Sequence, residues 1–231
     1  MEFIEGKSLA QIITDKQNLK PSDGKEIVRR LIGHALEMCH IYGYFHADPH
    51  PANIIYTPTD ELVYVDFGIM GSLTKIERVT LLRYFRSMLA SDTNEAFTAL
   101  SSLCSIPLYA NIEQVKTEYN RLAQKIENTF RSKTYLEQQK ISGPILTDIL
   151  KLFQKNGFKL PISIVRYFKM FETMEGLVFA LYPNLQVTEM LTEFKNVTEL
   201  NLVNSLINAF DEKSIEQIMM KLVNTLEKSL T

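Results

Sequence analysis

The helical spacing of apolar residues that runs through most of this chain stops between Tyr44 and Gly71. From Lys75 onward the spacing returns, punctuated by proline and glycine. It predicts helices over 75–90, 92–104, 112–133, 141–156, 161–182 and 197–229. A chain with this pattern is expected to fold mainly as packed helices around one irregular segment.

Before Tyr44, apolar residues three or four apart predict a helix over 23–42 that ends at Gly43. A short apolar cluster around Leu9 predicts one or two helical turns, after the end of a strand at 1–4. Both elements precede the segment where the helical period is lost.

Within the segment 44–71, two short runs rich in β-branched and aromatic residues, 54–56 and 62–65, flank a turn signal at 57–60. This pattern is typical of a β-hairpin. The predicted fold class is therefore mainly α with a small β-hairpin, in one domain without a long linker.

The composition narrows the classes of function. Lys and Arg number 25 and Asp and Glu number 27, which gives a formal charge of −2. A nucleic-acid binder is expected to show a basic excess, so we expect no nucleic-acid partner. Hydrophobic residues make up 45% of the chain, which argues against intrinsic disorder. Cys39 and Cys104 lack the paired spacing of a zinc or disulfide framework and are expected to be reduced.

The hydropathy of the chain predicts where it resides. No stretch approaches the roughly 18 consecutive apolar residues of a spanning helix, and the first residues lack the pattern of a secretory signal. We therefore expect a cytoplasmic protein that meets a membrane only peripherally, if at all.

The segment 44–71 contains the residue types that enzymes use for phosphoryl transfer. His46, Asp48 and Asn53 have the spacing His-x-Asp-x-x-x-x-Asn, and Asp66-Phe67-Gly68 follows across the predicted hairpin. A carboxylate at Asp48 can accept the proton of an acceptor hydroxyl, and Asn53 and Asp66 offer the hard oxygen ligands that Mg²⁺ prefers. The competing interpretation makes these polar residues ordinary turn residues in a proline-rich loop.

Two histidines in this segment have other expected roles. His46 is flanked by apolar residues and is expected to be a buried, hydrogen-bonded structural residue rather than a catalytic one. For His50, contact with a phosphate group and simple packing of the loop both stay open.

The residues 45–54 and 65–71 together closely resemble the UbiB-type (AarF/ADCK-like) atypical kinases. The segment 1–6 is similar to the hinge of that family, where backbone groups meet the adenine, so Glu2, Phe3 and Ile4 are implied as nucleotide-binding residues. Late in the chain, 174–176 and 182–185 resemble a helix of the family and its exit.

The resemblance implies a protein-kinase-like C-terminal lobe over 1–190, with a hinge at 1–6, a catalytic loop at 44–53 and a metal-binding loop at 66–71. It also implies ATP and Mg²⁺ as cofactors and a link to ubiquinone or other isoprenoid-quinone metabolism. One departure is Ala52, where the family has glycine, because alanine restricts positive φ. The segment 191–231 is expected to be an amphipathic helical extension.

The larger departure is that the chain begins at the hinge, so we expect the N-terminal lobe to come from another chain or to be lost by truncation. Two functions then compete. One is a truncated or split UbiB-like kinase or ATPase lobe that binds Mg-ATP and transfers no phosphate at a useful rate alone. The other is a non-catalytic, pseudokinase-like binding module for a lipid, a quinone or a protein partner, such as a quinone-biosynthesis protein.

Overall fold

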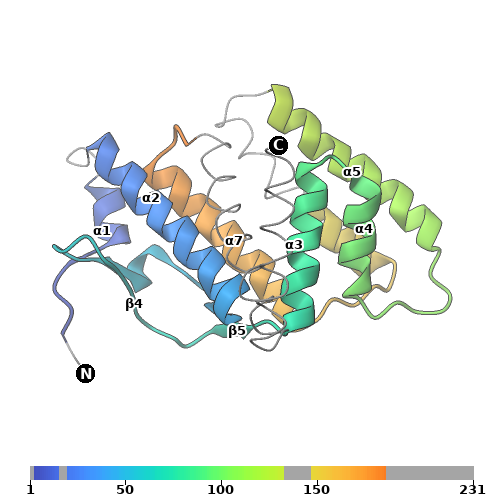
Figure 1. Ribbon diagram of the computed structural model, residues 1–231, viewed down its shortest axis with the longest axis horizontal. Coiled ribbons are helices and arrows are strands. Elements are labelled where there is room, and N and C mark those ends of the chain that lie inside the picture. The colour runs from blue at the N-terminus through green and yellow to red at the C-terminus, as the bar shows by residue number, and fades with distance from the viewer. Residues whose placement is uncertain (1–2, 16–19, 133–146, 186–231) are drawn as a thin grey trace, which may run out of the picture.

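A computed structural model of the chain describes residues 3–15, 20–132 and 147–185 (Figure 1). Several of the predictions fall partly or wholly outside these ranges. Glu2 of the predicted hinge, the first six residues of the predicted 141–156 helix and the whole 191–231 extension lie outside the described residues.

Helices make up most of the described chain. They are α1 (Leu9–Thr14), α2 (Pro21–Leu36), α3 (Lys75–Leu89), α4 (Thr93–Ser102), α5 (Ile112–Ser132), the helical residues 147–155, and α7 (Ile162–Leu181). Each matches a predicted helix within the described residues to within a few positions. The prediction of a mainly helical fold is confirmed.

The predicted 23–42 helix changes its geometry before it ends. After α2 the chain continues as a π-helix, η2 (Glu37–Tyr42), and stops at Gly43, whose φ is 75°. The carbonyl groups at a helix end lack partners in the helix itself. Arg78 of α3 supplies donors here, because its Nη1 lies 3.3 Å from the carbonyl oxygen of His40 and 2.5 Å from that of Ile41.

The predicted hairpin is present and belongs to a three-stranded antiparallel sheet. Strand β3 (Ile54–Tyr56) pairs with β4 (Leu62–Tyr64), with Ile55 opposite Val63. Strand β1 (Lys7–Ser8) adds to the free edge of β3. The turn of the hairpin includes Asp60 at a φ of 63°.

A second, two-stranded sheet was not predicted, so the expectation of a single hairpin was incomplete. Strand β2 (Tyr44–His46) pairs with β5 (Met70–Ser72), and Phe45 lies opposite Gly71. A Cβ atom on Gly71 would come within 2.2 Å of the buried Phe45 ring. Glycine is therefore required at this position for the two strands to pair.

One hydrophobic core joins α1, α2 and α7 to α3, α4, α5 and the helical residues 147–155. Figure 1 shows α2 and α7 running side by side, with α3, α4 and α5 grouped to their right. Tyr167 of α7 is fully buried, and its hydroxyl lies 2.8 Å from Nε2 of His40. Cys39 is buried and Cys104 is half-buried, and both are free thiols as predicted.

Helix α7 also forms hydrogen bonds with β5 and with the start of α3. Arg166 Nη1 donates to the carbonyl oxygen of Met70 at 3.1 Å, and the Ser163 hydroxyl donates to the Glu77 carboxylate at the start of α3. Burial alone would raise the pKa of Glu77, but hydrogen bonds from Ser163 and Thr74 hold it below its ordinary value. No helix in the described ranges combines the length and hydropathy needed to cross a membrane.

Candidate functional site

The predicted site residues lie where the two small sheets meet. Strands β3 and β4 form a hairpin nested between β2 and β5, so the segments 47–53 and 65–69 both cross from one sheet to the other. Two backbone hydrogen bonds join these segments. The amide of Ala47 donates to Ile69 at 3.0 Å, and the amide of Val65 donates to Asn53 at 2.8 Å.

His46 provides a side-chain link between the same segments. Its Nδ1 accepts a hydrogen bond from the amide of Asp48 at 3.3 Å, and its Nε2 lies 3.2 Å from the carbonyl oxygen of Val65. Since an amide N–H can only donate, Nδ1 is the acceptor and Nε2 carries the proton that it donates to Val65. His46 is 1% exposed, which confirms the expected buried, hydrogen-bonded role.

Aromatic rings enclose the His46 imidazole. The ring of Phe67 lies 5.7 Å from it and that of Tyr64 lies 6.2 Å from it, between centroids. Burial raises the pKa of the Tyr64 phenol above its ordinary value, so this hydroxyl stays protonated. Phe67 is 59% exposed, so one side of the cluster is open to a further partner.

The loop between β2 and β3 is held by its own backbone. The amide of His50 donates to the Asp48 carbonyl at 2.7 Å, and the amide of Asn53 donates to the His50 carbonyl at 2.8 Å. Nδ1 of His50 also accepts from the amide of Ala52 at 3.3 Å, which gives His50 a role in shaping the loop. Ala52 sits in the short 3₁₀ turn η3 (Pro51–Asn53) and does not adopt positive φ, so alanine is tolerated there.

The backbone at Asp66 is in an unusual conformation for a residue other than glycine. Its φ is 57°, in the left-handed region, where Asp and Asn are the commonest non-glycine residues. A Cβ on Gly68 would lie 3.2 Å from Oδ1 of Asp66, so Gly68 leaves room for this carboxylate. Such a conformation is typical of functional turns that the surrounding structure holds in place.

The three predicted polar residues differ in exposure. Asp48 and Asp66 are exposed, and Asn53 is half-buried. No three His, Cys, Asp or Glu side chains of the described segments gather closely enough to hold a metal ion. The donor set nevertheless fits Mg²⁺, which commonly binds one or two protein oxygens and completes its shell with phosphate and water.

The predicted hinge lies beside the three-stranded sheet. Phe3 is 90% exposed and Ile4 is half-buried, and both precede β1 along the chain. Their nucleotide-binding role stays a prediction.

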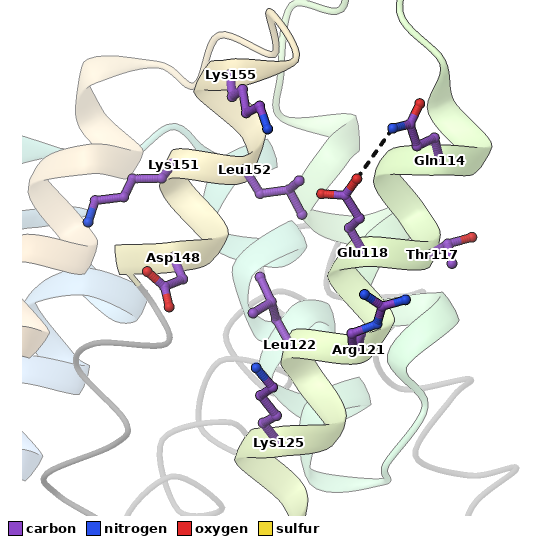
Figure 2. Close-up of a pocket in the computed structure, with 10 residues that line it drawn as sticks. All are labelled: Gln114, Thr117, Glu118, Arg121, Leu122, Lys125, Asp148, Lys151, Leu152 and Lys155. Atoms are coloured by element: carbon purple, nitrogen blue, oxygen red, sulfur yellow. Dashed lines mark hydrogen bonds between the residues drawn. The ribbon is translucent and has the colours of Figure 1, made fainter.

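A cavity of about 680 Å³ lies elsewhere, between α5 and the helical residues 147–155 (Figure 2). None of the sequence-predicted site residues lines it. Asp48 and Asp66 therefore lie in exposed loops and not in this cavity.

Sequence reasoning missed two residues that hold the site in place. Arg78 caps the π-helix that leads into β2, and Arg166 holds β5 through Met70. Both act on backbone carbonyls of segments far away in the sequence, so no local pattern indicates them.

Comparison with known proteins shows what the part of the chain that carries this site is similar to. Residues 1–100 match the ABC1 atypical kinase-like domain. The chain is 26% identical over 152 residues to Protein ACTIVITY OF BC1 COMPLEX KINASE 7, chloroplastic, of Arabidopsis thaliana, which covers 66% of this chain and 21% of that protein. It is 34% identical over 93 residues to Protein ACTIVITY OF BC1 COMPLEX KINASE 3, chloroplastic, of Arabidopsis thaliana. This match covers 40% of this chain and 13% of that protein.

A third relative is an uncharacterized protein of Synechocystis, 27% identical over 194 residues. The match covers 82% of this chain and 32% of that protein, so the chain spans about a third or less of the relatives named here. The family match contains both loops of the candidate site, and the predicted extent to residue 190 stays a prediction. Over residues 1–100 the chain is therefore similar to ABC1 atypical kinase-like domains.

Proposed function

We propose that the segment 44–71 forms the acceptor and metal side of an ATP-dependent phosphotransfer site. The observation that carries this proposal is the link through His46, which ties the loop of Asp48 to the residue before Asp66. Phosphoryl transfer depends mainly on holding an acceptor, a metal ion and the phosphates in register, so two cross-linked loops suit it.

Each polar residue has a distinct role in this proposal. The exposed Asp48 carboxylate orients the acceptor hydroxyl and receives its proton. Asp66 and the amide oxygen of Asn53 hold Mg²⁺, which neutralises charge on the phosphate oxygens when bound. The hydrogen bond between Val65 and Asn53 keeps the two metal-binding residues on neighbouring segments.

A complete nucleotide site also needs groups that contact the phosphates from the opposite side. We propose that these come from outside the 231 residues, as part of a longer polypeptide or as a separate N-terminal lobe. Phe3 and Ile4 would then meet the adenine through their backbones. We further propose, on the family resemblance alone, that the activity belongs to ubiquinone or other isoprenoid-quinone metabolism, with a peripheral membrane contact and quinone-biosynthesis proteins as partners.

A non-catalytic binding module is the second candidate. The observation that favours it is a group of exposed apolar side chains near β5: Tyr44 is 68% exposed, Ile76 is 76% exposed and Ile162 is 66% exposed. Their elements are neighbours, because Ser163 of α7 bonds to Glu77 of α3. Exposed apolar surface of this kind is typical of an interaction site.

Calorimetric titration of the purified chain with ATP, with and without Mg²⁺, tests the proposal. Asp66→Asn keeps the left-handed backbone accessible and removes the charge, so Mg²⁺-dependent binding should weaken by about tenfold or more. The matched control is Asp60→Asn, since Asp60 is also exposed and has a φ of 63° at the other end of the hairpin. The control should bind as the parent does.

Asp48→Asn separates binding from chemistry. With the complementary lobe supplied, this variant should retain Mg-ATP binding and lose turnover, since Asp48 acts on the acceptor and not on the metal. If the chain binds no nucleotide at millimolar concentration, or if Asp66→Asn and Asp60→Asn behave alike, the proposal is wrong and the binding module becomes the better account.

A further inference from the structure

The groove between α5 and the helical residues 147–155 has a charge pattern that the phosphotransfer proposal does not use (Figure 2). Leu122 and Leu152 lie in its floor, on facing helices. The charged side chains that line it are Glu118, Arg121, Lys125, Asp148, Lys151 and Lys155. Four cations against two carboxylates give the groove a positive balance.

The two helices carry the same arrangement of charge. Each has an acid, a cation three residues later and a second cation four residues after that: 118, 121 and 125 on α5, and 148, 151 and 155 on its neighbour. Residues at this spacing share one face of a helix. Figure 2 shows Lys125 and Lys155 reaching into the space between the helices from its two ends, whereas Lys151 points away from α5.

Several cations elsewhere on the described surface form ion pairs with carboxylates. Arg29 and Arg30 both bond to Glu26, and Arg83 bonds to Glu95. In the groove, no ion pair within 4.0 Å joins any of the lining cations to a carboxylate, counting only residues that the structure describes. Glu118 instead accepts a hydrogen bond from Gln114 at 3.4 Å. Among the described residues, Glu118 and Asp148 are the two carboxylates that line the groove with these four cations.

We propose that this groove is a binding site for a phosphate-bearing ligand with an apolar portion. Lys125, Lys155 and Arg121 would contact the phosphate oxygens, because ammonium and guanidinium groups form strong charge-assisted hydrogen bonds with them. The apolar portion would lie on Leu122 and Leu152. A volume of about 680 Å³ falls in the range of small-molecule sites and far exceeds what a single phosphate fills.

Two sources share this chemistry, a free phosphate compound and a lipid headgroup, and two probes distinguish them. The first is inorganic tripolyphosphate, titrated into the full chain by calorimetry without added Mg²⁺. The second is vesicles of phosphatidylglycerol in phosphatidylcholine, assayed by cosedimentation against phosphatidylcholine alone. Both are run near physiological ionic strength, where exposed charges more than about 8 Å apart are largely screened.

The test variant is Lys125→Gln with Lys155→Gln, which removes one cation from each side of the groove. The matched control is Lys116→Gln with Lys159→Gln, two lysines that do not line the groove. Binding of at least one probe should fall by about tenfold or more in the test variant and by less than about twofold in the control. All four substituted lysines lie at least partly exposed, so both variants should fold.

Tripolyphosphate binding with this dependence identifies a free phosphate compound as the ligand class, and vesicle binding alone identifies a lipid headgroup. Absence of binding to both probes, or equal loss in the two variants, would overturn the proposal. Asp66→Asn should leave binding at the groove unchanged. Failure here is thus separable from failure of the phosphotransfer proposal, which depends on Asp66.

Discussion

Nε2 of His46 lies 3.2 Å from the carbonyl oxygen of Val65, while Nδ1 of the same ring accepts the amide hydrogen of Asp48. One buried imidazole therefore spans the two segments that carry the proposed base and the proposed metal ligand. Because both of its nitrogens are used, the ring fixes the separation of the segments as well as their contact. Substitutions at this position should affect the two loops together.

Substitutions of His46 that keep one of its two hydrogen bonds should show how much each bond contributes to stability. Glutamine can replace the Nε2 donor to Val65, and asparagine can replace the Nδ1 acceptor for Asp48. His46→Ala keeps neither and leaves a cavity, so it should lower the free energy of unfolding by roughly 2–4 kcal/mol. We expect His46→Gln and His46→Asn each to cost clearly less in urea unfolding. Equal losses in all three variants would show that the bonds contribute nothing beyond packing.

The elements that the sequence predicts well are those whose signal is local. Helices α3, α4, α5 and α7 follow from apolar spacing and from the prolines and glycines between them. The β3–β4 hairpin follows from its turn, because its strands are separated by only five residues. In each case the residues that define the element are its own neighbours in the chain.

The ribbon of β2 and β5 was not predictable in this way. Its strands have three residues each and pair across more than twenty intervening residues, so neither carries an alternating pattern long enough to recognise. The identities of Asp48, Asn53 and Asp66 follow from spacing, but the His46 bridge depends on pairing that brings distant segments together. The spacing of neighbouring residues does not show which distant segments will come into contact.

Gly71→Ala should disrupt that ribbon. The added methyl group would overlap the Phe45 ring, which is fully buried and cannot move without a core rearrangement. Overpacking of a core typically costs about 1–3 kcal/mol, and a contact this short places the variant at the upper end of that range. Gly176→Ala is the control, because nothing lies within 4 Å of a Cβ there and alanine favours the helix. Denaturant unfolding of both variants measures the difference.

A double substitution tests whether Phe45 causes the loss. Phe45→Leu shortens the side chain opposite Gly71, so it should cost less in the Gly71→Ala background than in the parent. The coupling energy should be at least about 1 kcal/mol, as is usual for residues in contact. If the two changes are simply additive, the clash lies elsewhere in the ribbon.

The stability of the fold should depend on the protonation of His40. Burial lowers its pKa to about 4, and the positive charge of Arg78 acts in the same direction. The unfolded chain takes up this proton near pH 6.5 and the folded chain does not, so stability is full above about pH 6.5 and falls towards pH 4. The predicted loss reaches roughly 3 kcal/mol by about pH 4.

Comparison with His40→Gln isolates this contribution from that of the carboxylates. Between about pH 7.5 and about pH 5 the parent should lose roughly 2 kcal/mol more unfolding free energy than the variant, measured in urea. Glutamine retains a hydrogen-bonding group for Tyr167 but has no proton to gain. Parallel pH profiles for the two proteins would contradict the assignment.

Arg78→Met should alter both the stability of the π-helix end and the titration of His40. Methionine keeps the apolar stem and removes the donors to the carbonyls of His40 and Ile41, so the cost should be about 1–3 kcal/mol. Loss of the positive charge should also raise the pKa of His40, which burial still keeps below its ordinary value. Histidine ring signals followed by NMR over a pH series report this shift.

Arg86→Met is the control, because Arg86 is an exposed position on the same helix. It should change stability by less than about 0.5 kcal/mol and leave the His40 titration unmoved. If both arginine variants shift His40 equally, the general field of α3 and not the contact of Arg78 controls it.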